Sequence, residues 1–171
     1  YKWLEAAGTT MVSEQPPELA AMVESTIDLI ERAQFENGYI GLTIPPDRPA
    51  ERWQDPAFKH ELFAAGHLFQ AAIAHRRATG SERLFDVAQR LADHVAAEFG
   101  PGQNEGRPGH PEIEMALVEM YRETGERRYL DTARFFVDAA GGAEMSAISG
   151  HAVKATFFAA GMADLYAETG E

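Results

Sequence analysis

The chain contains no cysteine among its 171 residues. Disulfides, thiolate nucleophiles and cysteine-ligated zinc sites are therefore excluded within it. Basic residues are also scarce, since 15 Lys and Arg stand against 27 Asp and Glu and leave a formal net charge of −12. A surface that binds nucleic acid or anionic lipid needs clustered cations. We therefore expect no nucleic-acid partner and no membrane partner.

Long apolar runs are absent as well. No run approaches the ~18–20 residues that a membrane-spanning helix needs, and no signal segment opens the chain. We therefore expect a cytoplasmic protein. The chain begins at Tyr1 rather than at Met, which indicates a processed or truncated start. Composition leaves open whether the protein forms a homo-oligomer. Because β-branched residues are sparse and alanine is abundant, helices are favoured over strands.

A Thr-Gly pair followed by Ser or Glu recurs at a spacing of 45 residues, at Thr79-Gly80, Thr124-Gly125 and Thr169-Gly170. A helical pattern precedes each pair, and glycine suits the left-handed position just after a helix ends. The Ser or Glu that follows can begin the next helix. Each pair is therefore predicted to form the tight turn of an αα-hairpin.

Apolar residues at helical spacing predict six helices, over residues 17–34, 60–78, 82–98, 111–123, 126–138 and 151–168. The second and sixth are small or apolar almost all round, which predicts burial on most sides, whereas the third and fifth have a polar face. Such alternation indicates an inner and an outer ring of helices. The predicted fold class is therefore all-α, built of helical hairpins of an (α/α)6 toroid, with an α-solenoid as the alternative.

Three hairpins make about half of a six-hairpin barrel, so residues 1–171 are expected to be a single, truncated domain. Loops rich in Gly and Pro are predicted over residues 37–56 and 100–109, and a third over residues 139–149. In a toroid, the loops that enter the inner helices surround one mouth. Long loops that carry aromatic residues tend to be functional.

Three histidines fall at helix starts on the side of this mouth, namely His60, His110 and His151. Acidic and aromatic residues are expected beside them: Glu61, Glu112, Glu114, Tyr39 and Trp53. Imidazole and carboxylate groups pair with sugar hydroxyls, and aromatic rings cover the apolar face of a sugar. The pattern therefore predicts a carbohydrate-binding pocket.

Plainer interpretations stand beside this one. A histidine at a helix start is often a cap, Glu61 suits the first turn of a helix, and Trp53 suits a loop anchor. Glu112 and Glu114 would point about 200° apart on one helix, so they could not both face the pocket. His75 and His94 lie on polar helix faces and are expected to be exposed. No His-x-x-x-His pair supports a metal site, so no metal ligand is expected within this chain.

The segment from His60 to Leu68 and the block from Pro108 to Glu114 resemble glycoside hydrolase family 127, the β-L-arabinofuranosidase-type enzymes. The resemblance extends over nearly the whole chain, through Tyr1–Glu5, Gln34–Tyr39, Leu84–His94, Tyr129–Phe136 and Gly150–Val153. It implies an (α/α)6 barrel and release of terminal β-L-arabinofuranose with retention. By the same resemblance His60, His110 and His151 would hydrogen-bond the sugar, supported by Glu61 and by Glu112 or Glu114.

The resemblance also implies a zinc-bound cysteine nucleophile and a glutamate acid/base. Both are expected outside this chain, so the segment alone is expected to be inactive and to hold no cofactor. The connection from Asp138 to Gly150 is shorter than the family's and lacks its Arg-Glu-Gln stretch. Two other functions stay open: a non-catalytic α-hairpin scaffold that binds a protein or glycan, and a sugar isomerase or epimerase that uses two histidines.

Overall fold

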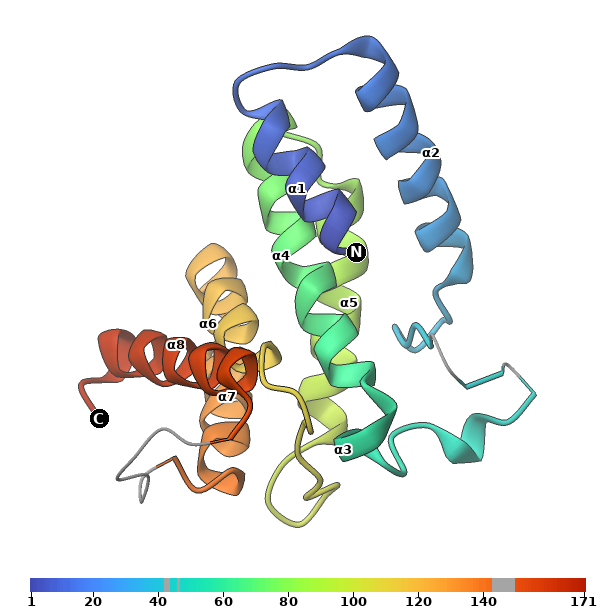
Figure 1. Cartoon of the computed structure of the whole chain (residues 1–171). Coiled ribbons are helices and arrows are strands. Elements are labelled where there is room, and N and C mark those ends of the chain that lie inside the picture. Colours follow the sequence, from blue (N-terminus) through green and yellow to red (C-terminus); the bar gives the residue numbers. More distant parts are fainter. Residues whose placement is uncertain (42–43, 46, 143–149) are drawn as a thin grey trace.

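A computed structural model describes residues 1–41, 44–45, 47–142 and 150–171 (Figure 1). Its helices are α1 (Lys2–Met11), α2 (Pro17–Ala33), α3 (Pro56–Lys59), α4 (Glu61–Thr79), α5 (Arg83–Glu98), α6 (Ile113–Thr124), α7 (Arg127–Ala139) and α8 (Ala152–Thr169), with a 3-10 turn η1 at Pro49–Glu51. Within these described ranges there is no strand beyond an isolated bridge between Phe99 and Asn104. The all-α prediction is confirmed.

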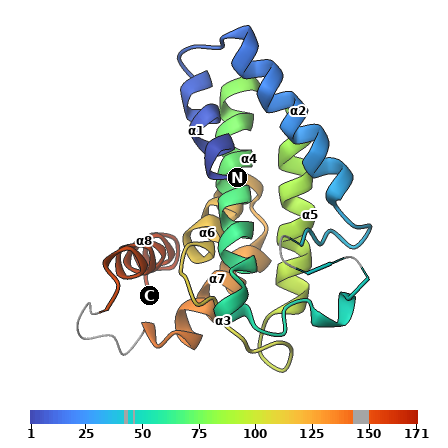
Figure 2. The same cartoon turned by 45° about the vertical axis from the view of Figure 1, so that its right-hand side comes forward.

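The helices form two rows, which the views in Figures 1 and 2 show from different sides. One row contains α1, α4, α6 and α8, each packed against the next. The other row contains α2, α5 and α7, and it runs alongside the first. None of the helices in the described ranges is long and apolar enough to cross a membrane. The predicted inner and outer rows are therefore present.

The three Thr-Gly pairs form the same turn. Each threonine hydroxyl donates to the carbonyl four residues earlier, at 2.8, 2.7 and 2.9 Å, and accepts the N–H two residues later, at 3.1, 3.2 and 3.2 Å. The glycines adopt φ values of 75°, 75° and 74°, which a residue with a Cβ adopts at a cost. The predicted turn geometry is confirmed.

The same repeat also places ion pairs between neighbouring inner helices. Arg77 of α4 binds Glu123 of α6 at 2.6 Å. Arg122 of α6, which lies 45 residues after Arg77, binds Glu168 of α8 at 2.6 Å. The carboxylates are 45 residues apart as well. One contact is therefore repeated at two successive junctions between hairpins.

One inner helix, α1, was not predicted from the sequence. Its buried residues Leu4, Ala7, Gly8 and Met11 follow helical spacing, but Gly8 and two threonines give the segment low helix propensity. Packing on α4 supplies the stability instead. A Cβ added at Gly8 would lie 2.9 Å from the backbone nitrogen of His75, so the two helices approach closely at this glycine.

Other expectations about single elements were also wrong. Residue Pro111 does not begin α6, which starts at Ile113 with Glu112 as its N-cap. Helix α8 buries only Phe158, Gly161 and Leu165 within this chain, although burial on most sides was predicted from its apolar sequence. No described segment of the chain covers its remaining faces. The loop predicted over residues 139–149 lies outside the described residues from position 143 onward.

Candidate functional site

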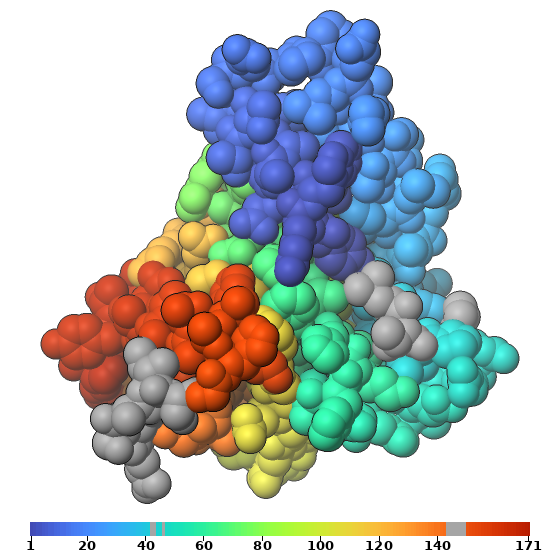
Figure 3. All heavy atoms as spheres, in the orientation of Figure 1, coloured from blue at the N-terminus to red at the C-terminus, as the bar shows by residue number. Residues whose placement is uncertain are grey.

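The N-terminal ends of α4, α6 and α8 meet at one place and bring three histidines together. The ring centroid of His110 lies 6.4 Å from that of His60 and 6.4 Å from that of His151. His60 and His151 are exposed and His110 is half-buried, so the group opens to solvent. Figure 3 shows the segments that carry these residues, in green, yellow and orange, meeting on one face. We call this group the histidine mouth.

Two phenylalanines line the mouth beneath the imidazoles. The ring of Phe63 lies 4.4 Å from His110 and 6.3 Å from His60, and the ring of Phe157 lies 6.0 Å from His110. The ammonium group of Lys2 in α1 sits 4.7 Å from the centroid of Phe63. Helices α1, α4 and α8 therefore each contribute a side chain at or near this opening, and His110 comes from the segment just before α6.

Backbone contacts fix which nitrogen of two imidazoles carries a proton. Nδ1 of His60 lies 2.7 Å from the carbonyl oxygen of Phe58, and Nδ1 of His110 lies 3.0 Å from that of Pro111. Because a carbonyl oxygen only accepts, Nδ1 donates in both rings. In the neutral rings Nε2 is then left with a free lone pair. Burial lowers the pKa of His110; the hydrogen bond to the Pro111 carbonyl opposes this shift, and the nearby positive charge of Lys154 adds to it.

His60 also has a strained backbone. Its φ of 57° and ψ of 17° place it in the left-handed region, between the end of α3 and the start of α4. A residue with a side chain pays roughly 1–2 kcal/mol for this conformation. Strain of this kind persists where surrounding structure fixes it and is frequent at binding sites. Here the reversal of the chain at His60 turns its ring toward His110.

Glu61, Tyr39 and Trp53 come together but lie in the interior. The Tyr39 hydroxyl donates to Oε1 of Glu61, and the Tyr39 ring packs edge-on against Trp53 at 5.3 Å. Burial, then the neighbouring Glu61 carboxylate, raises the pKa of Tyr39. Trp53 Nε1–H donates to Nε2 of His94 at 3.1 Å. Tyr39 is 0% exposed and Trp53 is 3% exposed, so both rings anchor the loop to α4 and α5.

The two remaining acidic residues are buried at the start of α6. Glu112 precedes the helix, and its backbone N–H donates to Oε2 of Glu114 at 2.8 Å. The argument that both carboxylates lie on one helix about 200° apart was therefore wrong. Glu114 fills the role of first-turn partner, since it accepts from a free N–H group at the N-terminus of α6. Its Cβ packs against Gly161 of α8, where an added Cβ would lie 2.9 Å away.

Two histidines expected to be exposed are not. His75 is 1% exposed because α1 covers the last turns of α4, and Nε2 of this residue lies 3.8 Å from Glu24. His94 is half-buried under the ring of Trp53, 6.1 Å between centroids. Each histidine lies on the polar face of its own helix, which is why exposure was predicted. Another part of the chain covers that face in the fold.

Sequence reasoning did not select Phe63, Phe157, His67 and Lys2. Phe63 follows His60 by three residues, a spacing that places both on one face of α4 and that was available in the sequence. Phe157 follows His151 by six residues, which is not a same-face spacing, so the helical pattern gave no signal for it. Lys2 could not be found in this way, because α1 was not predicted.

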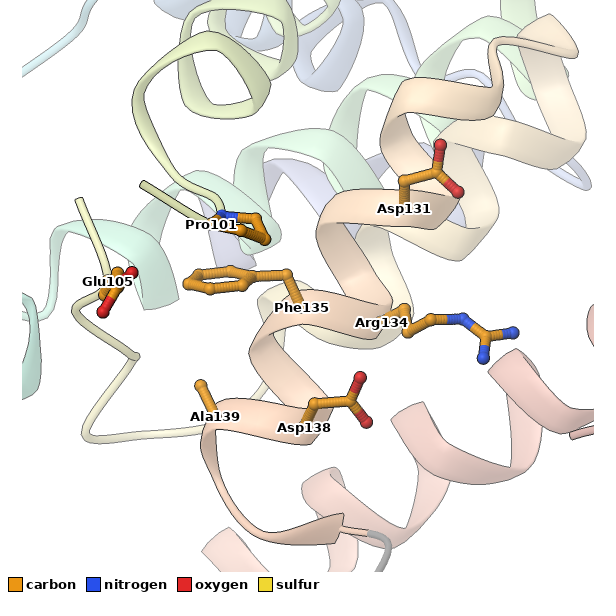
Figure 4. Close-up of a pocket in the computed structure, with 7 residues that line it drawn as sticks. All are labelled: Pro101, Glu105, Asp131, Arg134, Phe135, Asp138 and Ala139. Atoms are coloured by element: carbon orange, nitrogen blue, oxygen red, sulfur yellow. The ribbon is translucent and has the colours of Figure 1, made fainter. Parts of the chain in front are cut away.

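A separate hollow lies on the outer side of α7, away from the histidine mouth (Figure 4). It is lined by the Phe135 ring, Pro101 and the side chains of Glu105, Asp131, Arg134 and Asp138. It contains no histidine and none of the predicted site residues. Three convergent imidazoles, one of them half-buried, make the mouth the stronger candidate site.

Inner helices whose starts carry histidines around a shared opening define an α/α-toroid with a polar mouth. The family described as Beta-L-arabinofuranosidase, GH127 catalytic domain, matches residues 1–171, and the chain belongs to this family. The resemblance stated above is thus confirmed. The similar solved structures have the (α/α)6 barrel fold, which confirms the predicted toroid.

A curated relative, the non-reducing end beta-L-arabinofuranosidase of Bifidobacterium longum subsp. longum, is 42% identical over 149 residues, covering 82% of this chain and 22% of the relative. A GH127 beta-L-arabinofuranosidase structure from Geobacillus stearothermophilus T6 matches with a TM-score of 0.86 and 31% identity, over 99% of this chain and 32% of that one. A second GH127 beta-arabinofuranosidase structure matches with a TM-score of 0.86 and 32% identity, over 99% of this chain and 31% of that one. The chain spans a third or less of these relatives.

Proposed function

We propose that this chain is the sugar-holding part of a glycoside hydrolase that releases terminal β-L-arabinofuranose with retention. The observation that carries the proposal is the convergence of His60, His110 and His151 on one opening, at 6.4 Å between neighbouring ring centroids. Family membership supports the reaction class, and the names of the relatives supply the sugar.

The chemistry of the mouth suits a neutral sugar. Nε2 of His60 and of His110 are acceptors in the neutral rings, since both Nδ1 atoms are held by backbone carbonyls. Sugar hydroxyls donate to such acceptors, and the rings of Phe63 and Phe157 cover the C–H face of the furanose. His151 at the start of α8 closes the third side. Tyr39 and Trp53 are left out of this contact set because their rings are buried.

In this proposal, zinc and its cysteine ligands are supplied by residues outside this chain. The sequence has no cysteine, and no cluster of His, Asp and Glu in the described ranges could hold a metal ion. The residues present therefore do not fit the metal, and their work is to bind and orient the sugar. Carbohydrate as the partner, a cytoplasmic location and self-association also stay predictions.

Turnover of an aryl β-L-arabinofuranoside by the full-length protein, with zinc present, tests the proposal. Replacing His110 by Ala removes one hydrogen bond to the sugar and should lower kcat/KM about 5–30-fold, which corresponds to roughly 1–2 kcal/mol. Asp131→Asn on the exposed side of α7 is the control and should leave kcat/KM unchanged. Absence of turnover by the wild-type protein would refute the proposal. Interconversion of free sugars without zinc would identify an isomerase instead.

A further inference from the structure

A buried polar cluster lies below the histidine mouth, between α1, α4 and α6. Its centre is His67, whose Nδ1 lies 3.4 Å from Oε2 of Glu5 and 3.5 Å from Oε1 of Glu112. Glu112 is 0% exposed and His67 is 6% exposed. Neither ring nitrogen and neither Glu112 carboxyl oxygen has a hydrogen-bond partner in the described chain. Groups buried in this way are rare in proteins and indicate a specific role.

Glu112 is confined by α4 on one side and by its own backbone contact on the other. A Cβ added at Gly66 would lie 1.7 Å from Oε2 of Glu112, so the carboxyl group occupies the space above this glycine. The backbone N–H of Glu112 is held by Glu114. Glu112 also follows His110 by two residues, with a rigid proline between them. Glu112 is therefore joined to His110 by a short and stiff stretch of backbone.

A second path connects the same cluster to His110 through side chains. The His67 ring packs edge-on against Phe63 at 4.6 Å, and against Phe157 at 6.2 Å. Both phenylalanines then contact His110, at 4.4 and 6.0 Å. The two rings are thus sandwiched between a buried imidazole below and a mouth imidazole above.

We propose that Glu112 and His67 are positioning residues that hold Nε2 of His110 at the mouth, Glu112 through the backbone at the start of α6 and His67 through Phe63 and Phe157. Neither residue touches the sugar. This inference rests on the proposed function, in which His110 accepts a hydrogen bond from the substrate. Glu112 has no exposed surface, so contact with the substrate does not explain why the polar cluster is there. The positioning role does.

Steady-state kinetics of the full-length protein test the role. Glu112→Ala and His67→Ala should each raise KM about 5–10-fold, no more than loss of His110 itself, and leave kcat within about threefold, because a misplaced binding group weakens binding rather than chemistry. Glu112→Gln keeps the shape of the side chain and should return KM to within about threefold of wild type. The control Asp131→Asn, on the exposed side of α7, should leave KM unchanged. A loss of folded protein would lower kcat and leave KM alone.

A double-mutant cycle gives the sharper outcome. If both residues act on His110, the double alanine variant should be no more than about threefold worse than the poorer single variant. Fully additive effects, or an unchanged KM in both single variants, would overturn the inference. Glu112→Asp, which withdraws the carboxyl group by one methylene, replaces Glu112→Ala if the latter does not fold.

Chemical labelling separates this inference from the proposed function. Diethyl pyrocarbonate acylates accessible neutral imidazoles, and mass spectrometry reports the rate at each histidine. Glu112→Ala should change the labelling rate of His110 at least about threefold relative to His94. If the wild-type protein shows no turnover, the proposed function fails while this labelling result still decides the inference. An unchanged rate at His110 would overturn it.

Discussion

Replacing Glu112 by Gln should stabilise the protein at neutral pH and have less effect at acidic pH. Burial, followed by the nearby carboxylates of Glu5 and Glu114, raises the pKa of Glu112 well above 4.5. The carboxyl group is therefore held protonated in the folded state at pH values where the unfolded chain has lost that proton. Gln is neutral at every pH and similar in shape, so the variant avoids this loss.

The sign and size of the effect follow from proton linkage. Between pH 4.5 and the raised pKa of Glu112, the folded protein binds one more proton than the unfolded chain, so its stability falls as pH rises. The slope is about 1.36 kcal/mol per pH unit. From about pH 5 upward, the stability of the variant should therefore rise relative to wild type with this slope until the raised pKa of Glu112 is passed.

Unfolding of the full-length protein by urea at pH 5 and at pH 7.5, for wild type and Glu112→Gln, measures this difference. Comparing the two pH values cancels any constant cost of burying an amide that lacks partners. Glu18→Gln on the exposed side of α2 controls for loss of a surface negative charge. An equal difference at both pH values, or a variant that weakens as pH rises, would show that Glu112 is ionised in the fold and that the reasoning is wrong.

Three further outcomes are expected. Gly66→Ala should destabilise the protein by about 2–3 kcal/mol, because the new Cβ would lie 1.7 Å from Glu112 and 2.9 Å from the Ile113 backbone. An unchanged midpoint of thermal unfolding would contradict this. Burial lowers the pKa of His75, so stability should fall as pH drops below 6.5, and His75→Gln should lose that dependence in urea unfolding. Arg122→Ala breaks half-exposed pairs with Asp164 and Glu168 and should cost less than about 1 kcal/mol, shrinking in high salt; a large, salt-independent loss argues against that estimate.

The hairpin turns could be predicted because each of their parts is local. A threonine that bonds back to the carbonyl four residues earlier and a glycine at φ near 75° need only a few consecutive residues. Helix α1 could not be predicted in this way, since its stability depends on packing against α4, which is more than 50 residues away. The same omission produced the error at His75, because α1 is the element that buries it.

The candidate site shows the same division. His60, His110 and His151 lie at the same end of the inner helices, and the repeat predicted this direction. The interior position of Tyr39 and Trp53 depends on how a loop of about 20 residues folds back over α5, which no local pattern encodes. The burial of Glu112 depends on the absence of a side chain at Gly66.

The spacing of the mouth histidines has a physical explanation in the lengths of the inner helices. His60 lies 19 residues before Thr79 and His151 lies 18 before Thr169, but His110 lies only 14 before Thr124. Helix α6 has 12 residues where α4 has 19, so it is shorter by about 10 Å at 1.5 Å per residue. The three non-helical residues His110, Pro111 and Glu112 can advance about 3.3 Å each, which restores that distance. If these residues were helical, His110 would lie about 6–7.5 Å short of the level of its neighbours, which is four or five residues at 1.5 Å each. The sequence prediction began this helix at Pro111, two residues too early. The non-helical stretch before α6 is therefore what brings the third imidazole level with the other two.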